Sequence, residues 1–423
     1  MLTKEQNERI CRVGPGTPMG NVQRRYWQPV LLSEELPEND GAPLRVRVLG
    51  EDLIAFRDSE GKVGLVSAFC PHRRAPMFFG RNEECGLRCV YHGWKFDRHG
   101  TCVDMPSEPP DSLFKTKVTI DAYPTHEAGD VIWAYMGAKE TMPGPPDFEW
   151  MRAPKTHRFV SKTFEAANWV QGLEGGLDSA HSSFLHNERL GDPGWIRNRD
   201  GAPRIDVERT DYGYTYTSRR NLGDDGEYIR LYQYIMPGQA VRGGINGLMG
   251  GRAKVPKFDL HIWLPIDDEN TWVYNIMYTY DSAYPMSPEY IEEQEHLLGR
   301  GKSDHIPGTY FLKANKTNDY LIDRQMQKTK NFTGIVGINT QDMAVQEGMG
   351  AIVDRSKEHL GTSDKAIIAM RQLLLEACDA VEAGGTPRGV DPALTRTIRP
   401  YDDVVKPGAD WRAVFAPEVV AKW

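Results

Sequence analysis

The 423-residue sequence lacks the features that mark membrane, secreted and nucleic-acid-binding proteins. No apolar run approaches the length of a membrane span, and the first residues lack the apolar core of a signal peptide. The net charge of −8 offers no basic face to nucleic acid. Six cysteines are too few for a disulfide framework in so long a chain. We therefore expect a cytoplasmic protein that binds neither membrane nor nucleic acid.

Four candidate metal ligands form two mixed pairs, Cys70-Pro-His72 and, after sixteen residues, Cys89-Val-Tyr-His92. Zinc also takes two Cys and two His, but zinc motifs usually pair Cys with Cys and His with His. A Rieske [2Fe-2S] cluster instead has two thiolates on one iron and two imidazoles on the other. The spacing therefore predicts a Rieske cluster, which stores one electron. The other four cysteines form no second pattern.

The pattern of apolar residues changes along the chain. Short strands broken by turns predict a β-rich module up to about residue 140, with the two ligand loops between its hairpins. The Pro- and Gly-rich stretch 142–147 is the best candidate linker. A helix within 165–187, strand signals over 204–280 and helices after residue 288 follow. This order predicts an α+β protein.

A second candidate metal site contains His181 and His186. If the segment is helical, Gln171, Glu174, Asp178 and His181 form one polar stripe, because they are three, four and three residues apart. His186 lies about 140° further round an ideal helix, so the two imidazoles converge only if the helix ends or bulges between them. A solvated helix face is the alternative. Two His and one carboxylate would form the facial triad of non-haem ferrous iron, and the upstream electron store favours this interpretation.

With these motifs, the chain resembles the large subunit of Rieske non-haem iron aromatic-ring-hydroxylating oxygenases, in particular the phthalate dioxygenase group. The similarity covers nearly the whole chain and is carried by residues 70–74, 89–94, 168–169, 173–175 and 178–183. The resemblance implies three parts. A helical segment, 1–25, packs on the catalytic domain; the all-β Rieske domain spans 26–140. The catalytic domain, 141–423, has an antiparallel sheet covered by helices in a helix-grip-like fold.

The resemblance also implies roles for two acidic residues. Asp342 matches the third iron ligand of the family, whereas the residues alone leave Asp319 and Glu347 as alternatives. Asp178 matches the residue that carries electrons from a cluster histidine of a neighbouring subunit, here His92, to the iron site. This bridge implies a homo-oligomer, either a trimer or a stacked pair of trimers.

The function implied by the resemblance is cis-dihydroxylation of an aromatic carboxylate of the phthalate, isophthalate or substituted-benzoate type, with O2. The chain contains no plant-type ferredoxin motif and no dinucleotide fingerprint. Electrons would come from a separate NADH-dependent reductase with flavin and iron–sulfur centres. A monooxygenase or O-demethylase acting on an aromatic acid uses the same metals and is an alternative. A non-enzymatic Rieske electron carrier is a third possibility, which the His181/His186 pair disfavours.

A buried ring carboxylate requires a fixed cation, and the planar fork of arginine suits it best. By position relative to the pocket of the family that the chain resembles, we favour Arg204 and Arg242 over Arg209 and Arg230, and Ser179 could add a hydrogen bond. The Gly-rich stretch 243–251 is either a loop over the pocket entrance or an exposed connection.

Overall fold

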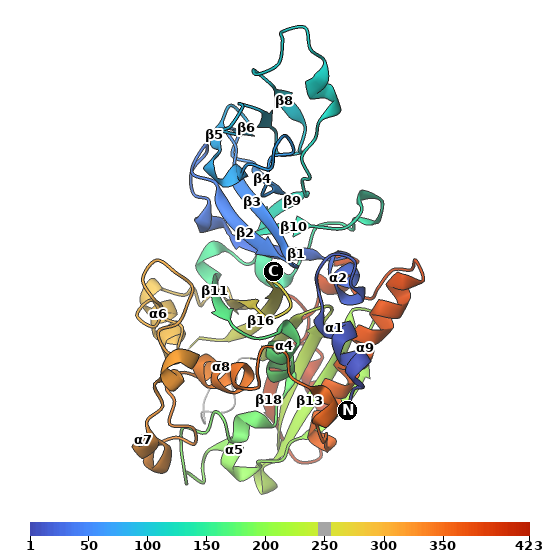
Figure 1. The fold of residues 1–423 in the computed structure, drawn as a ribbon. Coiled ribbons are helices and arrows are strands. Elements are labelled where there is room, and N and C mark those ends of the chain that lie inside the picture. The colour runs from blue at the N-terminus through green and yellow to red at the C-terminus, as the bar shows by residue number, and fades with distance from the viewer. Residues whose placement is uncertain (244–254) are drawn as a thin grey trace.

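The computed structural model describes residues 1–243 and 255–423. A smaller part of short strands stands on a larger part, in which helices surround a sheet of long strands (Figure 1). The predicted fold class, an N-terminal β domain followed by an α+β domain, is confirmed. Most of the Gly-rich stretch 243–251 lies outside the described residues.

The N-terminal domain contains three small antiparallel sheets, ordered β1-β10-β9, β2-β3-β4 and β5-β6-β7-β8. Its strands are β1 (Trp27–Leu32), β2 (Leu44–Val48), β3 (Glu51–Arg57), β4 (Val63–Ser67), β5 (Arg81–Glu83), β6 (Gly86–Arg88), β7 (Lys95–Phe96), β8 (Cys102–Asp104), β9 (Thr125–Ala128) and β10 (Val131–Tyr135). The turn between β3 and β4 forms because Asp58 accepts the amides of Glu60 and Lys62 and Gly61 adopts a φ of 77°. A separate apolar core lies beneath the ligand loops and includes Trp94.

The larger domain is built on one antiparallel sheet in the order β11-β17-β16-β15-β14-β13-β12, with β18 paired to β14. Its strands are β11 (Arg158–Glu165), β12 (Arg204–Arg209), β13 (Gly213–Asn221), β14 (Glu227–Ile235), β15 (Gln239–Gly243), β16 (Lys257–Pro265), β17 (Thr271–Thr279) and β18 (Tyr401–Val405). Because side chains alternate along each strand, one face of this sheet can carry polar groups while the other is apolar.

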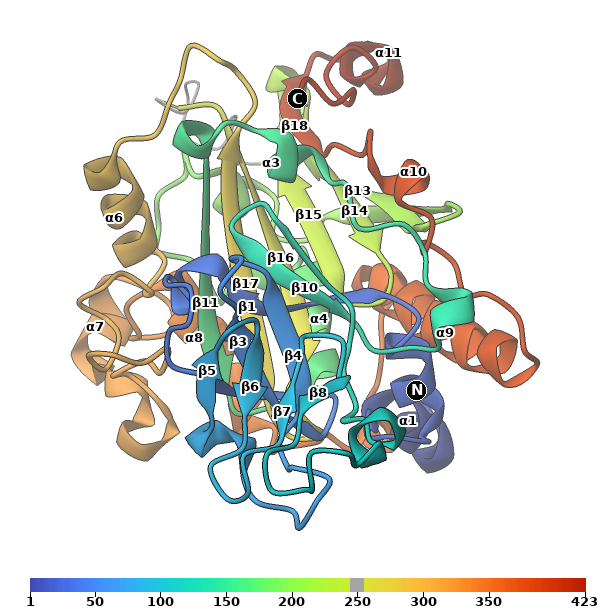
Figure 2. The same cartoon turned by 90° about the horizontal axis from the view of Figure 1, so that it is seen from above.

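Helices cover this sheet, and two helices near the N-terminus pack beside a helix near the C-terminus. They are α1 (Lys4–Cys11), α2 (Pro18–Gln23), α3 (Glu149–Arg152), α4 (Trp169–Leu177), α5 (Ile196–Arg199), α6 (Pro288–Leu297), α7 (Arg324–Thr329), α8 (Ile338–Gly348), α9 (Lys365–Glu382), α10 (Pro392–Thr395) and α11 (Trp411–Phe415). α4 packs on β15 and β16, and α8 packs on α4. α1 and α2 lie beside α9 at one side of the sheet (Figure 2).

The packing of α9 follows from its sequence. Ile367, Met370, Leu374 and Ala377 recur at helical spacing and are all buried, while Gly384 takes a φ of 78° just after the helix ends. Among the helices of the described residues, none combines the length and apolar character needed to cross a bilayer.

Candidate functional site with two metal centres

The two ligand loops of the N-terminal domain have the same backbone design. In the first loop the amide of Cys70 donates to the carbonyl of Ala75, and the amide of Arg74 donates back to Cys70, both at 2.9 Å. The second loop repeats these two bonds at 2.8 and 3.0 Å with Cys89, Trp94 and Gly93. In each loop the fourth residue after the cysteine has positive φ, 59° at Arg74 and 78° at Gly93. This turn brings each histidine back beside its cysteine.

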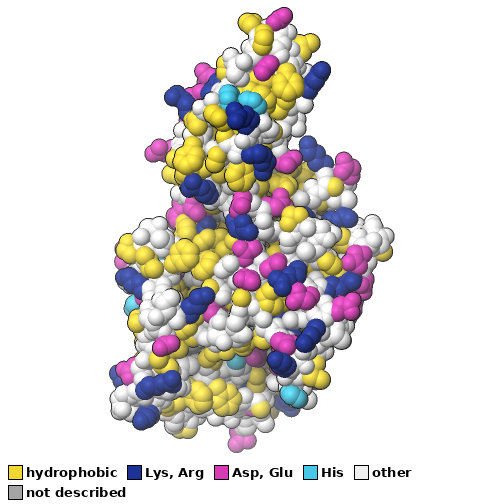
Figure 3. All heavy atoms as spheres, viewed as in Figure 1, with side chains coloured by type: hydrophobic (Ala, Val, Ile, Leu, Met, Phe, Trp, Pro, Cys, Tyr) yellow, Lys and Arg dark blue, Asp and Glu magenta, His cyan; other side chains and the backbone are white. Residues whose placement is uncertain are grey.

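The four side chains from these loops line one small cavity. The thiols of Cys70 and Cys89 are buried, and the rings of His72 and His92 lie 4.4 Å apart. The indole of Trp94 stacks on His72 at 4.3 Å. Two thiols on the inner side and two imidazoles on the outer side are the donor set of a Rieske cluster. Figure 3 shows histidine side chains beside basic ones on the surface of this upper domain, and His72 is exposed.

The predicted helix of the second site is shorter than expected. α4 ends at Leu177, and Asp178 is extended with its Oδ1 accepting the amide of Ala180 at 2.7 Å. The polar stripe is therefore broken, because Asp178 starts a new turn that leads to the short 3₁₀ helix His181–Ser183. The chain folds back within the next residues and returns His186 to His181.

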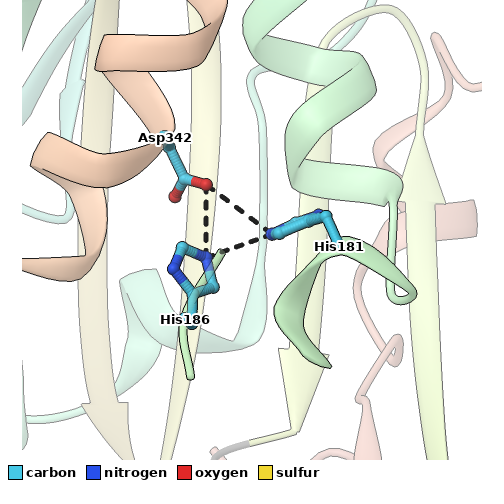
Figure 4. Close-up of side chains that lie close together, drawn as sticks. All are labelled: His181, His186 and Asp342. Carbon is cyan, nitrogen blue, oxygen red and sulfur yellow. Dashed lines mark hydrogen bonds and ion pairs between the residues drawn. The ribbon is translucent and has the colours of Figure 1, made fainter. Parts of the chain in front are cut away.

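Three predicted ligands converge at this turn (Figure 4). The Nε2 atoms of His181 and His186 are 3.1 Å apart, and Oδ1 of Asp342 on α8 lies 3.6 and 3.2 Å from them, respectively. One ligand atom from each residue lies within 4.8 Å of the other two, as a shared metal ion requires. Burial disfavours the charged form of Asp342, but the two histidines, His186 first, hold its carboxyl pKa below the ordinary value. This donor set fits ferrous iron in a facial triad.

Partners on the opposite ring nitrogens orient both histidines. Nδ1 of His186 lies 2.8 Å from Oε1 of Gln341, and Nδ1 of His181 lies 3.5 Å from Oδ2 of Asp178. Such partners leave Nε2 free as the metal-binding atom. Gln341 was not predicted from the sequence. It directly precedes Asp342, but no spacing rule identifies it as the partner of a metal-binding histidine. Glu347 instead binds the amide of Ala166 and the hydroxyl of Tyr320, at 2.9 and 2.6 Å.

The structure brings only some of the predicted substrate-binding residues to the triad. Arg242 lines a small cavity with Asp342 and approaches Nε2 of His261 to 2.5 Å. Ser179 is buried and donates to Ser218 at 2.7 Å. Arg204, however, is 61% exposed on the edge strand β12 and pairs with Glu227. The strand alternation turns Arg204 away from the face that carries Arg242, so it does not reach this cavity.

The remaining two arginine candidates differ in the same way. Arg209 is exposed and pairs with Glu376, whereas Arg230 is buried on β14 and donates to the carbonyl of Gly243 at 2.7 Å. The cavity beside Asp342 is also lined by Glu165, whose buried Oε1 atom has no hydrogen-bond partner among the residues that the structure describes.

One domain has two loops with the donor set of a Rieske cluster, and the next has a His–His–Asp triad. This combination defines the class of Rieske oxygenases. Comparison with protein families agrees, since residues 26–124 match the Rieske [2Fe-2S] domain and residues 134–422 match the LigXa C-terminal domain like family. The chain belongs to the Rieske non-haem iron oxygenases, as their catalytic oxygenase subunit.

Several relatives are similar over nearly their whole length. The phthalate 4,5-dioxygenase oxygenase subunit of Pseudomonas putida is 39% identical, covering 97% of this chain and 94% of its own. The 3-chlorobenzoate-3,4-dioxygenase oxygenase subunit of Comamonas testosteroni is 37% identical, covering 93% and 92%. The 5,5'-dehydrodivanillate O-demethylase oxygenase subunit of Sphingobium sp. is 33% identical, covering 94% and 86%.

Solved structures share the fold at low identity. A variant of Pseudomonas putida CBB5 NdmA with theobromine superposes with a TM-score of 0.64 at 18% identity, covering 92% of this chain and 98% of that one. The oxygenase in the reduced oxygenase–ferredoxin complex of carbazole 1,9a-dioxygenase superposes with a TM-score of 0.56 at 17% identity, covering 88% and 93%.

Proposed function

We propose that this oxygenase subunit adds both atoms of O2 to adjacent ring carbons of an aromatic carboxylate, giving a cis-diol. The observation that carries the proposal is the position of Arg242, a half-buried cation that lines the same cavity as the iron-ligand candidate Asp342. A carboxylate bound there would be neutralised beside the metal. Two relatives above 35% identity are named for aromatic acids, phthalate and 3-chlorobenzoate.

Each group of residues has one task in this proposal. His181, His186 and Asp342 hold ferrous iron, which supplies oxygen activation and one electron when bound. Cys70, His72, Cys89 and His92 hold the cluster that supplies the second electron. Arg242 and Ser179 orient the ring by its acid group, and the buried walls exclude water from the reacting carbons.

Electrons reach the iron through Asp178 in this proposal. Its side chain is 27% exposed and lies against Nδ1 of His181, so one carboxylate can contact both this imidazole and a group outside the chain. The exposed edge of a neighbouring subunit's cluster fits that position, which requires a homo-oligomer, a trimer or stacked trimers. A separate NADH-dependent flavin and iron–sulfur reductase, or a ferredoxin such as the one in the carbazole dioxygenase complex, reduces the cluster.

Product analysis with ¹⁸O2 tests the reaction type. Purified oxygenase and a compatible reductase are supplied with a panel of benzoates, phthalates and methoxybenzoates, and the products are analysed by mass spectrometry. Two labelled oxygen atoms in a diol support dioxygenation. One labelled atom, or release of formaldehyde from a methoxy group, supports the second candidate, a monooxygenase or O-demethylase, which the relative from Sphingobium favours. Consumption of NADH without any oxygenated product would contradict both.

A further inference from the structure

Glu165 is an acidic side chain to which the proposed function assigns no task. It is the last residue of β11, it is almost fully buried, and it lines the same cavity as Asp342. Within the described residues, its Oε1 atom has no hydrogen-bond partner. A buried oxygen without a partner is unfavourable. The carboxyl group therefore faces a site where a molecule from outside the chain would complete its hydrogen bonding.

The cavity lies between one face of the large sheet and two helices. Residues that pair across neighbouring strands share a face, and the register pairs Val273 of β17 with Thr163 on one side and with Trp263 on the other. Glu165 is two residues after Thr163 and points the same way. α4 packs on β16, and α8 packs on α4 and contributes Asp342 to the opposite wall.

Two glycines let α4 approach this wall closely. A Cβ atom at Gly172 would lie 2.9 Å from Oε2 of Glu165, and a Cβ atom at Gly176 would overlap the ring of Trp263. A glycine inside a helix costs about 1 kcal/mol relative to alanine. The close packing of α4 around the cavity therefore costs helix stability, which indicates that the helix must lie close to Glu165.

The acidic groups around Glu165 favour its neutral form. Glu347 and Asp342 on α8 both repel a negative charge on Glu165. Glu347 is held nearby, because its Oε1 atom accepts the amide of Ala166 at 2.9 Å. The lining residues that β17 and α4 contribute are uncharged. Burial, followed by the two acids, raises the carboxyl pKa of Glu165 well above its ordinary value. Glu165 therefore keeps its proton to higher pH than an exposed glutamate.

The two basic side chains that line the cavity do not neutralise Glu165. Arg242 on β15 lies 2.5 Å from Nε2 of His261 on β16, and Nδ1 of His261 lies 2.9 Å from Oδ1 of Asn275. Burial, followed by the charges of Arg242 and a second arginine, holds the pKa of His261 well below its ordinary value, so this ring is neutral at neutral pH. In the described ranges 1–243 and 255–423, neither side chain bonds Glu165.

The cavity has room for a water molecule. Its volume is about 30 Å³, which is roughly the volume that one molecule occupies in liquid water. Besides the two acids, polar side chains from both walls line it: Thr163 from the sheet, and Asn339 and Gln346 from α8. A buried water typically makes about two to four hydrogen bonds, and this lining offers them. Such a water would lie between Glu165 and Asp342.

Oxygenation consumes protons as well as electrons. An aromatic ring, O2, two electrons and two protons together give a cis-diol. Monooxygenation consumes the same numbers of electrons and protons, and one oxygen atom then leaves as water. A proton donor held close to the reacting oxygen, directly or through one water, is the usual way to supply such protons inside a protein.

We propose that Glu165 supplies one of these protons through a water molecule in the cavity. The O–H bond of Glu165 breaks, its proton passes to the water, and the water gives a proton to an oxygen atom of O2 as the electrons reduce it. The Glu165 carboxylate takes up a proton from solvent before the next turnover. This inference rests on the oxygenase chemistry of the proposed function and holds for both of its candidate reactions.

Infrared difference spectroscopy detects this proton without turnover. The iron-loaded protein, without reductant, is titrated from neutral to alkaline pH. We expect the C=O stretch of a protonated, buried carboxyl group, which disappears as pH rises and is absent from Glu165→Gln. Glu127→Gln is the control and should keep the band, because Glu127 lies in the other domain and its carboxylate is paired with Arg57 at 2.9 Å.

Single-turnover product formation tests the use of the proton. With normal iron content and normal substrate binding, Glu165→Gln should form product on the order of 100-fold more slowly. The rate of the unchanged protein should decrease as pH rises through the titration of the infrared band, and Glu165→Gln should lack this decrease. Glu165→Asp keeps an acid one carbon further from the cavity, so it should keep the band and part of the rate. A purely structural role of Glu165 would leave the pH dependence unchanged.

Two results would overturn the inference. One is the absence of a Glu165 carboxyl band at a pH where product forms. The other is product formation by Glu165→Gln at the unchanged rate and with the unchanged pH dependence. If Glu165→Gln does not fold, the same comparison with Glu165→Asp decides the outcome. A failure of the proposed function would instead appear in the labelled-oxygen products, and the infrared band would be unaffected.

Discussion

Nδ1 of His186 lies 2.8 Å from Oε1 of Gln341, the residue that immediately precedes Asp342 on α8. Nε2 of Gln341 in turn donates to the carbonyl of Ile335 at 2.9 Å, which fixes the amide with its oxygen toward the imidazole. In the proposed function, two successive residues of one helix would therefore serve the same metal centre. Asp342 would offer a ligand oxygen, and Gln341 would hold the ring of another ligand, His186, in the tautomer whose Nε2 can bind metal.

Replacing Gln341 by Leu should weaken iron binding without removing any ligand. The Nδ1–H of His186 would lose its acceptor inside a buried site, and a lost partner of this kind typically costs about 10–100-fold in metal affinity. Gln341→Glu keeps an acceptor oxygen at the same position and should retain iron better than Gln341→Leu. Competition with a chelator, followed by iron analysis, measures the affinity of each variant. Equal affinities of Gln341→Leu and the unchanged protein would show that this hydrogen bond does not position His186.

Replacing Asp342 by Ala should abolish iron binding at the triad, because two neutral imidazoles alone lack the anionic ligand of the facial arrangement. The cluster is in the other domain, so its absorbance should be unchanged. Iron and acid-labile sulfide analysis separates the two centres, and oxygen uptake with substrate should fall to background. Asp319→Ala is the matched control. An Asp342→Ala variant with a full complement of iron and normal turnover would mean that another acid is the ligand.

The ligand motifs could be predicted from the sequence because their chemistry depends on a few residue types at short spacing. The Cys70/His72 and Cys89/His92 pairs and the fold class could be predicted in this way. The end of α4 could not, because Asp178 leaves the helix by accepting the amide of Ala180, and helix and turn compete closely at such a residue. β11 and β18 were missed because pairing with distant strands, rather than local pattern, determines them.

The candidate substrate-binding arginines are a second case in which the sequence alone could not predict the structure. Arg204 and Arg242 both lie on strands, but alternation sends Arg204 to the surface, where it pairs with Glu227, and Arg242 to the cavity. A shift of one residue in register would reverse these positions. Register across seven sequential strands cannot be read from one sequence, so the placement of Arg230 and Arg242 on the same face of the sheet could not be predicted.

Replacing Glu174 by Gln should destabilise the fold. Glu174 bonds the guanidinium groups of Arg355 and Arg371, at 2.8 and 2.6 Å, and both arginines are almost fully buried. The amide would leave these two charges short of a buried counter-ion, and breaking such a pair costs about 3–5 kcal/mol. Denaturant unfolding measures the loss. Glu376→Gln, which removes the partner of the exposed Arg209, is the control and should cost less than about 1 kcal/mol. Similar losses in both variants would contradict the prediction.

Replacing Asp178 by Asn should slow electron transfer while both metal centres remain. Asn keeps the size and one acceptor oxygen, so the amide of Ala180 can still be bound, but the negative charge beside His181 is lost. We expect normal iron content, an unchanged oligomer and fast reduction of the cluster by the reductase. Reoxidation of the reduced cluster with substrate and O2 should become slow in single-turnover stopped-flow absorbance. Normal reoxidation at full iron occupancy would remove Asp178 from the electron path.

Replacing Glu165 by Gln should make the protein more stable at neutral pH, by an amount that grows with pH. Glu165 is 1% exposed, and its Oε1 has no hydrogen-bond partner within the described part of the chain. Burial, followed by repulsion from Glu347 and Asp342, raises its carboxyl pKa well above the ordinary 4.5. At pH values between the unfolded-state and folded-state pKa, the Glu165 carboxyl group is therefore protonated in the folded protein and ionised in the unfolded chain. Its contribution is neutral below about pH 4.5 and becomes increasingly destabilising as pH rises towards the folded-state pKa, at about 1.4 kcal/mol per pH unit.

The difference between the unfolding curves of Glu165→Gln and the unchanged protein isolates this effect, because every other titrating group is common to both. Denaturant unfolding of the metal-free proteins at several pH values gives the two curves. They should converge near pH 4.5 and separate as pH rises, with the variant more stable. Parallel curves would mean that Glu165 does not titrate differently in the two states.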